Sequence, residues 1–205
     1  MAHASKSGPP ALDDSLLARL RAETRAEHDA VERTLDLTGG GLTLEAYCRC
    51  LERFYGFLRP LEARLASQGG LEAHGVDPGA RQRTPLLAAD LTALGVDDLE
   101  RLPLCGDLPD VSRPAEAFGC LYVLEGSTLG GQVICRQVNK LLGVTPETGG
   151  RFFRGYGEET GAMWQAFREA LTAFADTPEA RSRVIESALA TFRSLRRWWD
   201  EGSTV

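Results

Sequence analysis

Residues 118–134 read FGCLYVLEGSTLGGQVI, and this stretch decides the fold class. It lies within a longer run, residues 112–143, in which apolar residues recur at helical spacing. Ser112 is a candidate N-cap, Pro114 falls in the first turn, and Gly143 stands where a helix commonly ends. The stretch therefore predicts one long helix.

The same spacing predicts helices on both sides of this one. They run from Leu12 to the Thr38–Gly41 segment and over residues 43–67, 85–94, 159–175 and 177–201. Pro60 should kink or divide the second of them, and residues 68–84 predict a loop. No stretch shows the alternation of a strand. We expect an all-α protein with six to eight helices, a loose tail at 1–11 and one domain over 12–205.

Composition and charge narrow the function classes. Hydrophobic residues make up 43% and charged residues 25% of the 205 residues, as in a soluble globular domain. The net charge of −6 offers no positive field to a nucleic acid or an anionic membrane. The sequence has no signal peptide, no apolar run of about 20 residues and no metal-binding cysteine pattern. We expect a cytoplasmic protein with reduced thiols and no nucleic-acid or membrane partner.

Four glycines interrupt the long predicted helix. Gly119, Gly126, Gly130 and Gly131 all fall inside it, and each costs about 1 kcal/mol relative to alanine. Gly126 and Gly130 share one face, which would let a flat ligand touch the backbone. The consecutive glycines at 130 and 131 also favour a kink. Close helix–helix packing uses the same small residues, so spacing alone does not separate the two interpretations.

His28 breaks the pattern of the first helix. It occupies the apolar face that carries Thr24 and Val31, where leucine or alanine is usual. The plain structural interpretation is a core histidine bonded to a carbonyl. Arg21 and Arg25 lie near it, toward the polar side, where they could instead pair with neighbouring acids. Together the three suit a ligand with a metal at one end and carboxylates at the other.

At this point the sequence resembles the haem oxygenase family. LEGSTLGGQVI (124–134) is similar to the distal helix of that family, and LRAETRAEHDAVE (20–32) to its proximal helix. The stretch from Phe167-Arg168 through TPEARSRVIESALATF (167–192) is similar to the C-terminal part, so the resemblance covers about 12–200. The GSTLGG form is most similar to bacterial enzymes that supply biliverdin, including those associated with bacteriophytochromes. The resemblance implies a single-domain helical bundle, with haem between the proximal helix and a kinked, glycine-rich distal helix.

The resemblance also implies a set of site residues. His28 would ligate the haem iron. The distal, catalytic side would be formed by Gly126, Ser127 and Gly130. The haem propionates would be bound by three arginines: Arg21, Arg25 and Arg168.

Three positions depart from the family pattern. Ser127 stands where many members carry an aspartate that organises water, and a serine can hold a water but carries no charge. Trp164 replaces a lysine four residues before Arg168. Tyr122 is displaced by one residue from a tyrosine that lies near the propionates in some relatives. The distal water network and the site of ring cleavage are therefore not assigned by the resemblance.

The activity that the resemblance implies is the oxidative opening of haem to biliverdin, with release of CO and ferrous iron. Haem would be both substrate and cofactor, and O2 would be consumed. No GxGxxG or P-loop motif is present, so electrons would come from a separate reductase or ferredoxin, and a photoreceptor could accept the biliverdin. Two other interpretations stay open: a haem carrier or sensor on the same scaffold, and a helical interaction module without a cofactor.

Overall fold

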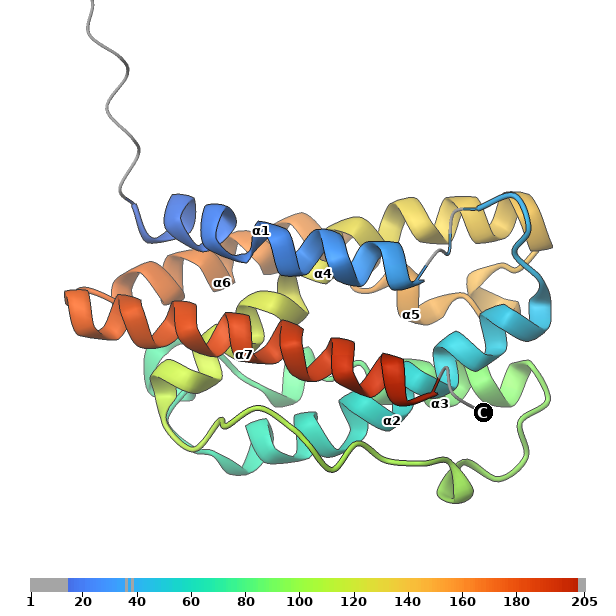
Figure 1. Ribbon diagram of the computed structural model, residues 1–205, viewed down its shortest axis with the longest axis horizontal. Helices are drawn as coiled ribbons and strands as arrows, with labels where there is room; N and C mark the ends of the chain where they lie inside the picture. Colours follow the sequence, from blue (N-terminus) through green and yellow to red (C-terminus); the bar gives the residue numbers. More distant parts are fainter. Residues whose placement is uncertain (1–14, 36, 38, 203–205) are drawn as a thin grey trace, which may run out of the picture.

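The computed structural model describes residues 15–35, 37 and 39–202, which form helices and no strand (Figure 1). The α-helices of this part of the chain are α1 (Leu16–Leu35), α2 (Leu44–Ser67), α3 (Thr84–Ala93), α4 (Pro114–Leu142), α5 (Arg151–Arg154), α6 (Thr160–Phe174) and α7 (Pro178–Gly202). Short 3-10 helices are η1 (Glu72–His74), η2 (Gly79–Arg81), η3 (Leu99–Arg101), η4 (Pro146–Thr148) and η5 (Gly157–Glu159). The predicted all-α class is confirmed, and the predicted tail at 1–11 lies outside the described residues.

The helix boundaries follow their local signals with two exceptions. Thr43 caps α2, and the Thr177 hydroxyl accepts a hydrogen bond from the Ala180 amide at the start of α7. Pro60 does not divide α2, which is continuous through it. Ser112 is not the cap of α4, because α4 begins at Pro114 and Arg113 takes the cap position without a side-chain bond. The backbone amide of Ser112 instead donates to the Asp110 carboxylate.

The long helix α4 is the centre of the fold. Gly143 ends it in the left-handed conformation, with φ of 70°, which a glycine adopts without strain. Its apolar side is buried against α7. Its first half also packs on α6, through Phe118 and Tyr122, and Gly131 in its later half meets α5. In Figure 1 the yellow-green first part of α4 and its yellow later part run in different directions, so the helix bends along its length.

Two further groups of helices hold α4 in place. The first consists of α1 and α7, which pack on each other and lie side by side in Figure 1. The second consists of α2, α3 and α5, with α3 packed on both of the others. The buried Asp90 carboxylate of α3 accepts from the Arg151 and Phe152 amides at the start of α5. This long-range cap explains why the four-residue α5, which the sequence did not predict, forms here.

Candidate functional site

Two glycines of α4 serve helix packing. A Cβ atom added to Gly119 would collide with the Val184 carbonyl of α7 and lie 2.6 Å from the Ser187 Cβ. A Cβ atom added to Gly131 would lie 2.8 Å from the Phe153 carbonyl oxygen. Real Cβ contacts of this kind are excluded by van der Waals repulsion, so α7 and the segment at α5 approach α4 only because these residues lack side chains.

The other two glycines have no packing role of this kind. A Cβ atom on Gly130 would meet nothing outside its own helix within 4 Å, and one on Gly126 would meet only the Trp164 ring, at 3.8 Å. The nearby side chains of Leu129 and Val133 are 44% and 54% exposed. Bare backbone and large apolar side chains thus lie together on one exposed part of α4, and apolar patches of this kind mark binding surfaces.

The helices α1, α4 and α6 meet at Tyr122. Its phenol contacts the Thr24 hydroxyl of α1. Burial raises the pKa of Tyr122, whereas the positive charges of Arg21 and Arg168 act to lower it. The two arginines, one on α1 and one on α6, therefore both act electrostatically on this phenol. Tyr122 is therefore a site candidate, although in the sequence it is displaced by one residue from the tyrosine of some relatives.

The junction between Thr24 and Tyr122 determines where the bare face of α4 lies relative to α1. Four residues further along α1 stands His28, and four residues further along α4 stands Gly126, followed by Gly130. A step of four residues keeps a side chain on nearly the same face of a helix. His28 and Gly126 therefore each lie one turn beyond this contact, on nearly the same helix faces as Thr24 and Tyr122.

The His28 side chain is oriented by its neighbours. It is 52% exposed, so its interpretation as a buried core histidine is wrong. Its Nδ1 lies 3.6 Å from a carboxylate oxygen of Asp29 and 3.7 Å from one of Glu32. The ring meets the buried Phe192 of α7 edge to face, with centroids 6.0 Å apart. Carboxylates flank Nδ1, which leaves Nε2 available as a metal ligand, the usual arrangement for a metal-binding histidine.

An ion-pair cluster holds α1 on α7 next to His28. Glu27 accepts a hydrogen bond from Arg193 at 3.0 Å and forms an ion pair with Arg196 at 3.1 Å, both of α7, and its side chain is only 16% exposed. A mostly buried carboxylate with two charge-assisted partners restricts movement of the helix that carries it. The helix α1 is thereby fixed at the residue that precedes His28.

Arg25 is paired with an acid of its own helix. Its side chain is 80% exposed, and its Nε is 3.9 Å from an oxygen of Asp29, one turn further along α1. This exposed ion pair is the alternative that the sequence left open for Arg25, in which it pairs with a neighbouring acid. Arg21 and Arg168 thus both influence Tyr122, whereas Arg25 has a partner within its own helix.

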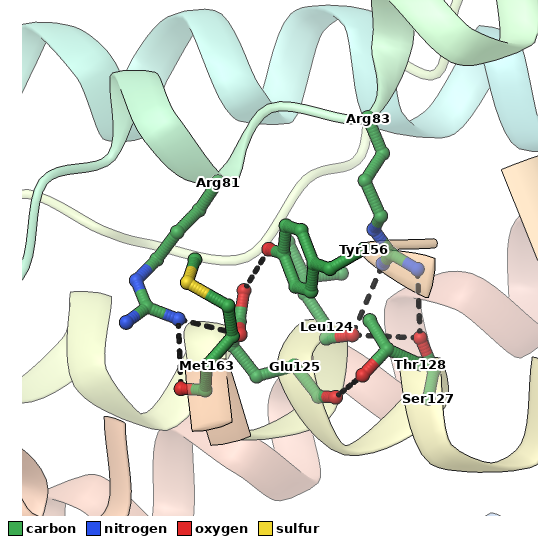
Figure 2. Close-up of polar contacts among 8 residues, drawn as sticks. All are labelled: Arg81, Arg83, Leu124, Glu125, Ser127, Thr128, Tyr156 and Met163. Carbon is green, nitrogen blue, oxygen red and sulfur yellow. Dashed lines mark hydrogen bonds and ion pairs between the residues drawn. The ribbon is translucent and has the colours of Figure 1, made fainter. Parts of the chain in front are cut away.

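A buried polar network, not predicted from the sequence, supports the glycine-bearing turn of α4 (Figure 2). Arg81 of η2 forms an ion pair with Glu125 at 2.6 Å, and the two side chains are only 6% and 2% exposed. The Tyr156 hydroxyl donates to the other oxygen of Glu125 at 2.7 Å. Burial raises the pKa of Tyr156, and the adjacent carboxylate raises it further. These contacts attach α4 to two other segments at the residue before Gly126.

Arg83 reaches the same turn of α4 from the same loop (Figure 2). Its Nη2 donates to the Leu124 carbonyl at 3.0 Å and its Nη1 to the Ser127 hydroxyl at 3.2 Å. The buried Glu62 carboxylate of α2 accepts from the backbone amides of Arg83 and Thr84, at 2.9 and 3.0 Å. The sequence gives little signal for this role, because Arg83 lies in a glycine- and proline-rich loop 41 residues before Leu124.

The buried pair of Arg81 and Glu125 provides a stability test. We expect Glu125→Gln to lower the free energy of unfolding by about 3 kcal/mol, because it leaves the Arg81 guanidinium buried without a counter-charge. Urea unfolding measures the change. The control is Glu23→Gln, which removes one half of an exposed pair with Arg19 in α1 and should change stability by less than about 0.5 kcal/mol. Equal effects of the two substitutions would contradict a structural role for the buried pair.

Comparisons with known proteins agree on one family. A family model described as heme oxygenase matches residues 14–201. A curated heme oxygenase of Xanthomonas campestris pv. campestris is 31% identical over 154 residues, which are 75% of this chain and 88% of that protein. The heme oxygenase of Neisseria meningitidis, solved with NO and CO bound, superposes with a TM-score of 0.76 at 26% identity over 92% of each chain. The heme oxygenase of Leptospira interrogans shares the fold, with a TM-score of 0.75 at 19% identity, over 91% of this chain and 99% of that one.

Proposed function

Because the chain belongs to the heme oxygenase family, whose members degrade haem, we propose that haem binds between α1 and α4. His28 would lie on one side of the ring, and Gly126 and Gly130 on the other. The observation that carries this placement is the division of the four α4 glycines, because only this pair would accept a Cβ atom without a clash. Two glycines that each weaken a helix without a packing role require a ligand to explain them.

The residues around this space fit haem in their chemistry. The ring is flat and apolar, which matches the bare glycine backbone and the exposed Leu129 and Val133. Its propionates are anionic, which matches Arg21 and Arg168 beside the Tyr122 phenol. When bound, the haem iron supplies the redox chemistry that activates O2 and opens the ring.

His28 would hold the iron through Nε2. Glu32 and Asp29 flank its Nδ1, so the N–H of the neutral ring belongs on that nitrogen, and the lone pair remains on Nε2. A neutral imidazole donates less electron density to iron than a thiolate does, and therefore favours O–O bond cleavage less strongly. This is the ligand expected for an enzyme that oxidises its own haem ring.

The distal side would be formed by Gly126, Ser127 and Gly130. The two glycines would bring backbone close to the ring and leave little room for a misdirected ligand, while the Ser127 hydroxyl is a polar group next to Gly126 in the chain. The products would be biliverdin, CO and ferrous iron. Trp164, which packs against Tyr122 and Gly126, would cover one edge of the site.

The reaction needs O2 and electrons from another protein. A reductase or a ferredoxin would supply the electrons, since the sequence carries no nucleotide-binding motif. An association with a bacteriophytochrome remains a prediction. None of the helices within residues 15–35 and 39–202 combines the length and the apolar character needed to cross a membrane.

Aerobic turnover of the haem complex tests the proposed function. Purified chain is loaded with one equivalent of haem and given a reductant, and the pigment is identified by chromatography. We expect loss of the Soret band, appearance of biliverdin and release of CO. A stable ferrous complex without pigment would show a haem carrier instead, and the absence of a Soret shift on titration with haem would contradict haem binding altogether.

Arg168 tests the propionate end of the site. We expect Arg168→Ala to weaken haem binding by about tenfold or to change the mixture of biliverdin isomers, because it removes a bidentate charge-assisted partner of a carboxylate. Haem titration and chromatography of the pigment measure the two effects. Arg183→Ala, at an exposed position on α7, is the matched control. A wild-type affinity together with a wild-type isomer mixture would contradict the role of Arg168.

A further inference from the structure

Arg83 is a buried cation that no carboxylate neutralises directly. The residue is 4% exposed, and among the described residues no carboxylate oxygen lies within ion-pair distance of its guanidinium. Glu62 is bound to its backbone amide, and Glu125 is engaged by Arg81 and Tyr156. A buried charge without a counter-charge is costly. The presence of this charge beside the turn of α4 that carries Ser127 therefore indicates a functional role.

The partners of the Ser127 hydroxyl determine what it can do. Its single hydrogen is donated to the Leu124 carbonyl, with an O–O distance of 2.7 Å. One lone pair accepts from Arg83 Nη1 at 3.2 Å. A hydroxyl has one donor and two acceptor sites, so one lone pair remains for the exposed side. Held in this way, the Ser127 hydroxyl is able only to accept a further hydrogen bond, not to donate one.

Arg83 itself is fixed at both ends. Glu62 binds its backbone amide, and the ring of Phe152 lies under the guanidinium, 5.2 Å from its central carbon. The planar guanidinium then donates to the Leu124 carbonyl and to the Ser127 hydroxyl at the same time. A single ammonium group would not do this in the same geometry. The result is a preorganised positive charge behind the Ser127 hydroxyl.

We propose that Arg83 is a positioning residue of the distal site, acting through Ser127. It holds the hydroxyl as an acceptor, so that a water donating one hydrogen to Ser127 keeps its other hydrogen for a ligand on the haem. This inference rests on the proposed placement of haem between α1 and α4.

Fluoride binding to the ferric haem complex tests the inference without turnover. Fluoride is a small anion that accepts hydrogen bonds, whereas CO on the ferrous complex is neutral and serves as the internal control. For Arg83→Met we expect the fluoride affinity to fall about tenfold, as for loss of a hydrogen bond to a charged donor, and the CO affinity to change by less than about twofold. Ser127→Ala should reproduce most of the fluoride effect.

The double variant Arg83→Met/Ser127→Ala separates a linked action from an independent one. If Arg83 acts through Ser127, the double variant loses about as much fluoride affinity as the larger single variant. If the fold-loss of the double variant equals the product of the two single fold-losses, the proposal is overturned. It is also overturned if the fluoride and CO affinities fall together. If Arg83→Met does not fold, Arg83→Lys decides: we expect a loss of about threefold, because lysine keeps the charge but not the fork, and a wild-type affinity overturns the proposal.

The wild-type chain distinguishes this inference from the proposed function. A wild-type complex with a normal Soret band whose fluoride affinity is insensitive to Arg83 overturns the positioning role alone. Failure of the wild-type chain to bind haem overturns both.

Discussion

Replacing His28 by alanine is expected to abolish the histidine-type haem spectrum and to lower the rate of biliverdin formation by at least about 100-fold, since even partners of a metal ligand contribute factors of 10 to 100. The side chain is half exposed and leaves no cavity in the core. The free energy of unfolding should therefore change by less than about 0.5 kcal/mol. Absorption spectra of the haem complex and urea unfolding measure the two effects.

Two further measurements make the His28 result specific. Added imidazole should restore part of the spectrum, because it returns a nitrogen ligand to the iron. His74→Ala removes another exposed histidine, in η1, and should leave the spectrum unchanged. A wild-type spectrum of the His28→Ala complex would contradict the assignment of the iron ligand.

The second large effect is expected for Gly130→Leu. A Cβ atom at this position meets no other part of the chain within 4 Å, and leucine is a better helix former than glycine. We therefore expect the free energy of unfolding to stay the same or to rise by up to about 1 kcal/mol. The same side chain would occupy the space proposed for the haem ring, so turnover should fall at least about 100-fold, as for a misplaced reacting group. Urea unfolding and pigment yield measure the two changes.

Gly119→Ala is the matched opposite of this variant. Its added methyl group would strike the Val184 carbonyl and the Ser187 side chain of α7, so we expect a loss of about 1–3 kcal/mol of stability. The haem complex of the folded fraction should keep its normal spectrum. If Gly130→Leu lost stability while retaining turnover, the glycines at 126 and 130 would be packing residues like the other two.

Much of the fold could be predicted from periodicity and local signals. The start of α7 after Thr177 and the end of α4 at Gly143 follow from hydrogen-bonding and backbone preferences that act within a few residues. The short α5 could not be predicted in this way, because Asp90 caps it from 61 residues away. Ser112 failed as a cap for a local reason: Pro114 opens the helix two residues later.

The site shows the same division between local and tertiary information. The sequence marked Gly126 and Gly130 as costly to the helix, but only the positions of α5 and α7 tell them apart from Gly119 and Gly131. Arg83 was not predicted, since its loop gives no periodic signal and its partners on α4 follow 41 and 44 residues later. Sequence patterns report which face a residue occupies, whereas partners distant in the chain depend on packing.

A crystal structure of the haem complex is the most direct test of the account. We expect iron bonded to Nε2 of His28, the backbone of Gly126 and Gly130 against the opposite face of the ring, and propionates directed toward Arg21 and Arg168. Haem bound elsewhere on the chain, or an iron without His28 as its ligand, would contradict it.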